Sequence, residues 1–212
     1  MKINVVKNIL DANDQMAAEN KLFFEKRHIV AVNIMASPGA GKTSLILRTI
    51  EGLGEPIAVI EGDIASTFDA EKVGEKQVPV VQINTGGACH LDASMIKTSL
   101  KKLSIDKAKY LFIENVGNLV CPAEFVLGEK VRVLVASVPE GDDKPFKYPG
   151  MFSTVQAVVL NKMDVLPYID FNVARFMEGV RAVNQEAPVF QVSCRMKEGL
   201  EAWIDWLKKI KS

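Results

Sequence analysis

The chain has 212 residues, a length that suits one domain with a full hydrophobic core. It has 26 basic and 26 acidic residues, so it lacks the excess of positive charge that is typical of proteins that bind nucleic acid or an anionic membrane. It contains no apolar run of transmembrane length, and its first residues lack the apolar stretch of a signal peptide. We therefore expect a single domain over residues 1–212, with a helical lead-in segment over 1–28, located in the cytoplasm and binding neither nucleic acid nor a membrane.

The predicted elements form an alternating series. Apolar residues spaced among polar ones over 8–27 predict one or two amphipathic helical turns that pack on the core. Alternating strands and helices then indicate an α/β fold with a doubly wound, mainly parallel seven-stranded sheet and helices on both faces. The predicted strands are 29–35, 56–63, 79–84, 110–117, 131–138, 156–160 and 188–192. Helices are predicted from residue 43 onward and over 93–102, 171–184 and 199–210, and a polar loop with three prolines over 139–150.

The first strand runs into Ala36-Ser37-Pro38-Gly39-Ala40-Gly41-Lys42-Thr43, and a helical pattern follows directly. A strand, a glycine-rich turn and a helix in this order are the context that a phosphate-binding loop requires, because the turn and the helix N-terminus direct N–H groups at phosphate oxygens. Ala36 replaces the glycine of the strict pattern by another small residue. We expect Lys42 to bridge the β- and γ-phosphates of a nucleotide and Thr43 to place its hydroxyl on Mg²⁺. The predicted nucleotide contacts here are Gly39, Ala40, Gly41, Lys42, Thr43 and Ser44.

Two later strands end in carboxylates, Asp63 and Glu114. Ligands of open α/β sheets bind outside the carboxyl ends of the strands, so both side chains should emerge near the phosphates. Asp63 would hold Mg²⁺ directly or through water, and Glu114 would lie beside Mg²⁺ or the attacking water, so that Lys42, Asp63 and Glu114 form the predicted catalytic set. Gly117 would let the backbone approach the γ-phosphate and respond to it. Asp69 is an open candidate, as an Mg²⁺ ligand or as a helix cap or solvated acid.

Cys89 and His90 follow the third strand and two glycines, Gly86 and Gly87. Neighbouring residues of a regular strand point to opposite faces, so the pair can share one ion only where glycines make the backbone irregular. Thiolate and imidazole suit Zn²⁺ or Ni²⁺ better than Mg²⁺. Cys121 adds a third ligand if the two loops leave neighbouring strand ends. Three ligands would leave an open coordination position, require an unidentified fourth ligand, or form a site that a symmetric dimer completes. The alternative to a metal site is a buried cysteine with a structural role.

The sixth strand leads into Asn161-Lys162-Met163-Asp164, a tetrapeptide that reads guanine when it ends a strand downstream of a phosphate loop. Asp164 would accept from the base N1–H and N2–H₂, which adenine lacks, while the stem of Lys162 covers the ring. After the seventh strand, Ser193 is expected to steady Asp164, and the N–H of Cys194 to meet guanine O6. The thiol of Cys194 is expected to be structural. The predicted base contacts are Asn161, Lys162, Asp164, Ser193 and Cys194.

In combination, these motifs resemble the HypB family of hydrogenase nickel-incorporation GTPases. The resemblance covers nearly the whole chain and rests on 37–43, Glu61-Gly62-Asp63-Ile64-Ala65, 89–93, 114–122 and 143–149. It implies a GTP-hydrolysing metallochaperone of the SIMIBI class that dimerises with GTP and helps load nickel into [NiFe] hydrogenase. We expect slow hydrolysis by the protein alone, since the sequence shows no arginine finger.

The resemblance also implies the ligands and partners. The ligands are GTP or GDP, Mg²⁺, and Ni²⁺ or Zn²⁺, with the last pair bound by Cys89, His90 and Cys121 at the dimer interface. The partners are a second copy of the chain, a HypA-type nickel and zinc accessory protein, and the precursor of the hydrogenase large subunit. Some members carry an N-terminal Cys-rich or His-rich nickel site, but this chain has no Cys before Cys89, which argues against tight storage.

Two other functions remain open. A related accessory GTPase could serve another enzyme such as urease, although that family usually has Cys-Pro-His where this chain has Cys89-His90. A small-molecule kinase could use the same phosphate loop, but the guanine tetrapeptide disfavours it. For the nickel metallochaperone, we expect the γ-phosphate and Mg²⁺ to order the loops after Asp63 and Glu114. Subunit docking would follow, and ordering of residues 115–118 would change the metal affinity at Cys121.

Overall fold

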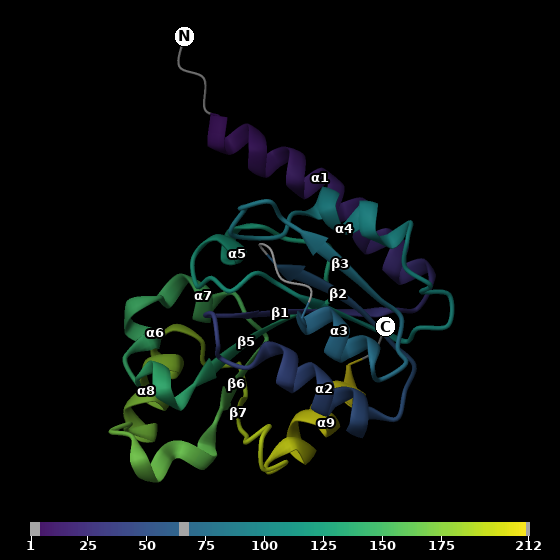
Figure 1. Cartoon of the computed structure of the whole chain (residues 1–212). Coiled ribbons are helices and arrows are strands. Elements are labelled where there is room, and N and C mark those ends of the chain that lie inside the picture. The colour runs from purple at the N-terminus through teal and green to yellow at the C-terminus, as the bar shows by residue number, and fades with distance from the viewer. Residues whose placement is uncertain (1–4, 64–67, 211–212) are drawn as a thin grey trace.

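Seven strands form one sheet: β1 (Val30–Ala36), β2 (Ile57–Asp63), β3 (Val80–Asn84), β4 (Tyr110–Glu114), β5 (Val131–Ser137), β6 (Ala157–Asn161) and β7 (Val189–Gln191). The computed structural model describes residues 5–63 and 68–210. Neighbouring strands all run parallel, in the order β3-β2-β4-β1-β5-β6-β7 (Figure 1). The predicted seven-stranded α/β sheet is confirmed, and it is entirely rather than mainly parallel. Strands buried on both faces explain the continuous apolar runs in the sequence.

Helices cover both faces of the sheet (Figure 1). One face carries α2 (Lys42–Leu53), α3 (Phe68–Gly74) and α9 (Leu200–Lys209). The other face carries α1 (Val5–Lys26) and α4 (Ala93–Leu100) over one half, and α7 (Pro149–Ser153) and α8 (Val173–Val183) over the other. The remaining turns of helix are α5 (Cys121–Glu124), α6 (Lys144–Lys147), η1 (Val138–Glu140) and η2 (Met163–Tyr168).

Alternation along β1 divides the core into separate clusters. Val32 and Ile34 pack in the cluster that includes Trp203 of α9, whereas Ala31 and Met35 belong to two different clusters beyond the opposite face. Because strand side chains alternate between faces, Asn33 lies between Ala31 and Met35 on that opposite face. The core beneath α1 and α4 is therefore separated from the core beneath α7 and α8 by a polar residue.

The lead-in helix α1 spans 22 residues, so the prediction of one or two turns was wrong. Its buried positions include two asparagines, Asn13 and Asn20, and this explains why hydrophobic periodicity revealed so little of the helix. Asn20 Nδ2 donates to the carbonyls of Ala93 and Leu127 at 2.8 and 3.0 Å. Asn13 Nδ2 donates to Val126 at 2.8 Å. The helix is therefore held to the domain partly by side-chain amides.

The segment 139–150, predicted as a polar loop, instead folds into short helices. Its three prolines stand in the first positions of η1, α6 and α7, where the missing N–H costs nothing, so proline marked helix starts here rather than a loop. Asp142 in this segment accepts from the N–H of Asn172 at 2.8 Å and from Arg175 at 3.3 Å. This acid is therefore occupied in anchoring α8.

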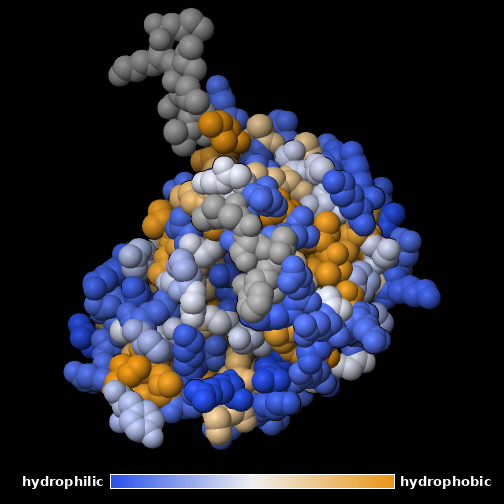
Figure 2. All heavy atoms as spheres, in the orientation of Figure 1, coloured by the Kyte–Doolittle hydropathy of each residue, from blue (hydrophilic) through white to orange (hydrophobic). Residues whose placement is uncertain are grey.

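The surface in Figure 2 is mainly hydrophilic, and its hydrophobic residues form small, separate groups. Large apolar side chains are nevertheless exposed at Ile9, Leu22, Val120, Phe146, Tyr168 and Met196. Within the described residues, no helix combines the length and apolar character needed to cross a membrane.

Candidate functional site

The phosphate-binding loop joins β1 to α2, as the sequence predicts. Gly39 and Gly41 have φ of 76° and 103°, in the left-handed region that side chains rarely adopt. A Cβ at Gly41 would lie 2.3 Å from Asn161 Nδ2, so glycine is also required there by close approach. Helix α2 begins at Lys42, and the unpaired N–H groups of its first turn make this end of the helix a site for an anion.

Thr43 and Glu114, two of the predicted Mg²⁺ ligands, are in direct contact. Thr43 Oγ1 donates to Glu114 Oε1 at 2.8 Å. Pairing of β1 with β4 and of β4 with β2 brings the carboxyl ends of these strands together, so Asp63, at the end of β2, emerges at the same edge. Hydroxyl and carboxylate oxygens are the ligands that a hard cation prefers, so this group fits Mg²⁺. The side chain of Asp69, and all of Ile64 and Ala65, lie outside the described residues.

The segment after β4 runs along the phosphate loop. A Cβ at Gly117 would lie 2.9 Å from both Cα and N of Pro38, so glycine allows the two backbones to touch. The N–H of Asn118 donates to the carbonyl of Ala36 at 2.8 Å. The predicted approach of Gly117 to a γ-phosphate remains a prediction, but the glycine is required for contact with the loop.

A cavity of about 540 Å³ opens beside the phosphate loop where a nucleotide base is expected. Ser193 Oγ donates to Asp164 Oδ1 at 2.6 Å, the contact expected to hold this carboxylate. Lys162 has a φ of 61° and donates from Nζ to the carbonyl of Gly39 at 2.7 Å. The predicted residues that line the cavity are Gly41, Ser44, Asn161, Lys162, Asp164 and Cys194.

Asn161 ties the phosphate loop to the base loop. Its side chain is buried, donates to the carbonyl of Ala40 at 3.0 Å and accepts from the N–H of Cys194 at 3.2 Å. The N–H of Cys194, which we expected to donate to guanine O6, therefore already donates to Asn161. Guanine O6 could only share this donor with Asn161. Burial raises the pKa of the Cys194 thiol to about 11, in keeping with a structural cysteine.

Three charged residues that line the cavity, Arg48, Glu51 and Lys76, were missed by sequence reasoning. Glu51 accepts from Arg48 and Lys76, both at 2.8 Å, and lies 3.5 Å from Lys197. These partners, Lys76 first and Arg48 second, lower the pKa of Glu51 to about 2. Arg48 also donates from Nε to the carbonyl of Cys194 at 2.7 Å. The only sequence signal was the spacing of Arg48 and Glu51 on one face of the helix after the loop.

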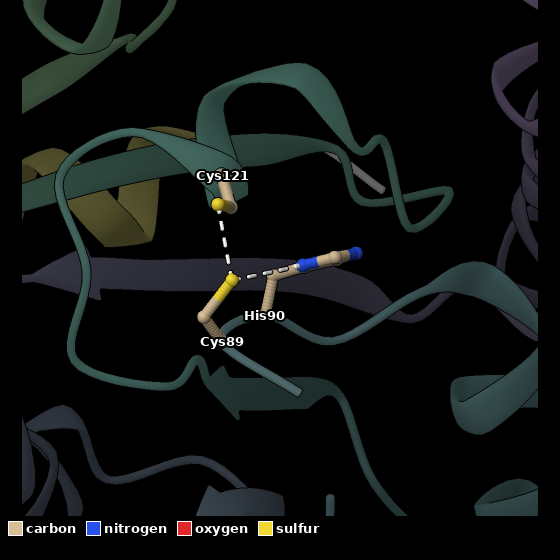
Figure 3. Close-up of side chains that lie close together, drawn as sticks. All are labelled: Cys89, His90 and Cys121. Atoms are coloured by element: carbon tan, nitrogen blue, oxygen red, sulfur yellow. Dashed lines mark hydrogen bonds between the residues drawn. The ribbon is translucent and has the colours of Figure 1, made fainter. Parts of the chain in front are cut away.

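The three predicted soft ligands converge (Figure 3). Cys89 Sγ lies 3.1 Å from Cys121 Sγ and 3.7 Å from His90 Nδ1, and the three ligand atoms all lie within 4.8 Å of one another. All three side chains are half-buried rather than enclosed in the core. In the part of the chain that the structure describes, this is the one Cys, His, Asp or Glu group of this kind.

The route by which these loops meet differs from the prediction. They do not leave neighbouring strands, because β2 lies between β3 and β4. The loop after β3 instead crosses the end of β2, where Leu91 packs against Gly62. A Cβ at Gly62 would lie only 2.8 Å from the side chain of Leu91. The N–H of Leu91 donates to Asn115 Oδ1 at 3.1 Å. Gly86 and Gly87, with φ of 60° and 107°, supply the irregular backbone expected before Cys89.

The electrostatics of the group suit metal binding. Burial lowers the pKa of His90, and the effect is opposed by Asp92 and Glu124, so the neutral imidazole that binds metals is favoured. The hydrogen bond with Cys89 is the main cause that raises the pKa of Cys121, so this thiol holds a proton that a metal must displace. Phe125, which the sequence did not single out, stacks on the His90 ring with centroids 3.9 Å apart.

Comparison with known proteins agrees with this geometry. Residues 30–191 match the family described as CobW/HypB/UreG, nucleotide-binding domain. The hydrogenase maturation factor HypB of Azotobacter vinelandii is 48% identical over 209 residues, covering 98% of this chain and 69% of that protein. The hydrogenase/urease maturation factor HypB of Helicobacter pylori strain J99 is 39% identical over 209 residues, covering 97% of this chain and 86% of that protein.

Two solved structures are also similar over nearly their whole length. HypB from Helicobacter pylori in complex with nickel has a TM-score of 0.90 at 39% identity, covering 93% of this chain and 94% of that one. HypB from Archaeoglobus fulgidus has a TM-score of 0.87 at 38% identity, covering 93% of this chain and 98% of that one. The chain therefore belongs to the HypB family of hydrogenase maturation factors, within the CobW/HypB/UreG nucleotide-binding domain family.

Proposed function

We propose that this protein is a GTP-hydrolysing metallochaperone that helps insert nickel into [NiFe] hydrogenase and switches by GTP-dependent dimerisation. The observation that carries the proposal is that one segment, residues 114–121, touches both sites. At its start, Glu114 accepts from Thr43 of the phosphate loop at 2.8 Å. At its end, Cys121 Sγ lies 3.1 Å from Cys89 Sγ. A change at the phosphates therefore has a short physical route to the metal ligands.

The nucleotide side of the proposal assigns a role to each group. Lys42 neutralises the phosphates, and Thr43, Glu114 and Asp63 would hold Mg²⁺, which supplies charge stabilisation when it is bound. Asp164, held by Ser193, selects guanine over adenine, because a carboxylate left without its donors disfavours ATP. Hydrolysis by the protein alone is slow.

The metal side treats nickel, or zinc in its place, as cargo. Two thiols and one imidazole leave coordination positions open, which suits transfer better than storage and allows a second copy of the chain to complete the site. A HypA-type accessory protein and the precursor of the hydrogenase large subunit are the proposed partners, in the cytoplasm, where the thiols stay reduced. The nickel complex of the Helicobacter pylori relative supports nickel as the cargo.

Maturation of [NiFe] hydrogenase in a bacterial host that lacks its own HypB tests the proposal. The wild-type chain should restore hydrogenase activity and bind Ni²⁺ in equilibrium dialysis, whereas Cys89→Ala/Cys121→Ala should do neither. Cys194→Ala is the matched control, because it removes the remaining thiol and should keep bound nickel. Restored hydrogenase activity with the double variant would contradict the proposal.

Urease is a second candidate recipient, because the Helicobacter pylori relative is named a hydrogenase/urease maturation factor. A parallel assay in a host whose urease depends on HypB and that lacks its own HypB separates the two recipients. Recovery of urease activity alone would favour this alternative.

A further inference from the structure

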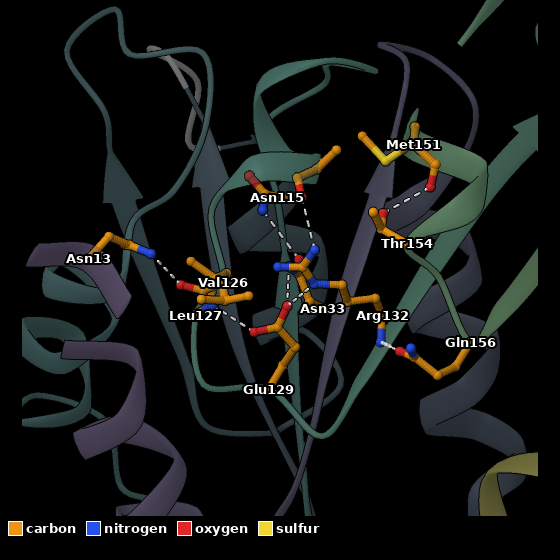
Figure 4. A network of polar contacts seen from close by, with 11 residues as sticks. Asn13, Asn33, Asn115, Val126, Leu127, Glu129, Arg132, Met151, Thr154 and Gln156 are labelled. Atoms are coloured by element: carbon orange, nitrogen blue, oxygen red, sulfur yellow. Dashed lines mark hydrogen bonds and ion pairs between the residues drawn. The ribbon is translucent and has the colours of Figure 1, made fainter. Parts of the chain in front are cut away.

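A row of polar side chains crosses one face of the sheet, between two apolar clusters (Figure 4). Asn33 of β1 and Asn115 after β4 are fully buried, and Arg132 of β5 is 9% exposed. Asn33 is the cross-strand neighbour of Arg132 in the pairing of β1 with β5. Apolar side chains cover the same face of the sheet on both sides of this row, so the row interrupts an otherwise hydrophobic layer.

These side chains form one continuous chain of hydrogen bonds. Asn115 Nδ2 donates to Asn33 Oδ1 at 3.2 Å, and Asn33 Nδ2 donates to Glu129 Oε1 at 3.3 Å. Arg132 Nε donates to the same Glu129 oxygen at 2.6 Å. The other oxygen of Glu129 accepts from the N–H of Leu127 at 2.6 Å, which fixes the carboxylate in place.

The two ends of this chain hold the two segments that carry the metal ligands. At one end, Asn115 Oδ1 accepts from the N–H of Leu91, the residue directly after His90, at 3.1 Å. At the other end, Arg132 Nη1 donates to the carbonyl of Ala123, in the short helix that begins with Cys121, at 2.9 Å. Strand β2 separates the strands that lead into these segments, so the polar chain is a lateral connection that sheet pairing does not provide.

Stability alone does not account for the arrangement. Removing a guanidinium and a carboxylate from water is costly, and apolar replacements of such pairs are often neutral or stabilising. Arg132 Nη2 is buried and finds no hydrogen-bond acceptor among the described residues, so part of that cost is uncompensated. Groups behind metal ligands commonly set the ligand geometry and tune affinity.

We propose that Asn33, Glu129 and Arg132 are positioning residues of the Cys89, His90 and Cys121 metal site. Through Asn115 and Ala123 they hold the two ligand segments at the separation that one metal ion requires. The proposal rests on the proposed function of this group as a metal site. It extends that function to residues of β1, β5 and the segment before β5 that touch neither metal nor nucleotide.

Asn33→Asp in the full-length chain tests the proposal, because the change is nearly isosteric yet replaces the amide donor with a carboxylate facing Glu129. We expect the Ni²⁺ affinity to fall about 10- to 100-fold and the nickel–thiolate charge-transfer absorption to shift. Asn184→Asp is the matched control. Its side-chain amide likewise donates hydrogen bonds within the domain, to the carbonyls of Phe152 and Val155 at 2.9 and 2.8 Å, but it holds no ligand segment. It should keep the wild-type affinity and spectrum even if it lowers the urea midpoint equally.

Wild-type affinity and an unchanged absorption band in Asn33→Asp would overturn the proposal. If that variant does not fold, Arg132→Lys replaces it, because lysine keeps the charge beside Glu129 but lacks the fork that also reaches Ala123. The same loss of affinity is expected there, and wild-type binding would again overturn the proposal. Cys89→Ala/Cys121→Ala, measured alongside, separates the two claims. Nickel retained by the cysteine variant contradicts the metal site itself, whereas nickel lost there but unaffected by Asn33→Asp contradicts only the positioning role.

Discussion

The hydroxyl of Thr43 donates to Glu114 Oε1 at 2.8 Å, so the phosphate loop is bonded to the first residue of the segment that ends at Cys121. Between these ends, Gly117 lies against Pro38, and the N–H of Asn118 donates to the carbonyl of Ala36. The segment therefore follows the phosphate loop before it reaches the thiols. We propose that the nucleotide state changes the metal affinity through this contact.

Gly117→Ala should disturb the contact directly. The new Cβ would lie 2.9 Å from backbone atoms of Pro38, so one of the two segments must shift. We expect a loss of about 1–3 kcal/mol in the free energy of unfolding and a fall of about 10- to 100-fold in kcat for GTP. Urea unfolding and phosphate release measure the two effects.

Gly150→Ala is the control for this substitution, because Gly150 is exposed and a Cβ there meets nothing within 4 Å. It should leave both quantities unchanged. Equal behaviour of the two alanine variants would mean that the close approach of Gly117 to Pro38 has no role in hydrolysis.

Asp164→Asn should change which base is preferred. The carboxylate accepts two hydrogen bonds from guanine in our proposal, whereas an amide presents a donor to the C2 carbonyl of xanthine. We expect GTP affinity to fall about 10- to 100-fold and XTP affinity to rise, as measured by competition with a fluorescent GDP analogue. Asp205→Asn, an exposed change on α9, is the control. An unchanged preference for GTP in Asp164→Asn would place the base elsewhere.

Glu51 should make the stability of the protein depend on acid pH. Its pKa is lowered from 4.5 to about 2 in the folded state, so its ionised form stabilises the fold above pH 4.5. This contribution is lost as the pH falls from 4.5 toward 2, and because the side chain is 32% exposed we expect it to be below about 1 kcal/mol.

Urea unfolding of the wild type and of Glu51→Gln, at pH 7 and at pH 3, measures this dependence. The wild type should lose more stability than the variant between the two pH values. Glu201→Gln, an exposed change in the first turn of α9, should follow the wild type. A loss in Glu51→Gln as large as in the wild type would show that the contacts with Arg48 and Lys76 do not stabilise the fold in solution.

Features carried by local sequence were predictable. The phosphate loop, the guanine tetrapeptide and the apolar strands each depend on residues close in the chain, and the class of fold followed from their order. The strand order could not be predicted in this way, because the position of β2 between β3 and β4 depends on tertiary contacts. The convergence of Cys89, His90 and Cys121 was predicted, but on the wrong assumption of neighbouring strands.

The supporting residues of the site were not predictable for the same reason. Asn161 was assigned to the base, yet its side chain joins Ala40 to Cys194, two positions far from it in sequence. Asn33 and Arg132 interrupt apolar strands without any motif, and their partners become visible only in the assembled sheet. Asparagines within α1 concealed the length of that helix, because buried amides do not contribute to hydrophobic periodicity.

The most direct test of the coupling is the Ni²⁺ affinity of the wild-type protein in two nucleotide states. Equilibrium dialysis of Ni²⁺ against protein saturated with GDP, and against protein saturated with a nonhydrolysable GTP analogue and Mg²⁺, provides the comparison. Coupling through residues 114–121 predicts affinities that differ about fivefold or more, and a smaller difference in Gly117→Ala. Equal affinities in the two states of the wild-type protein would contradict the account.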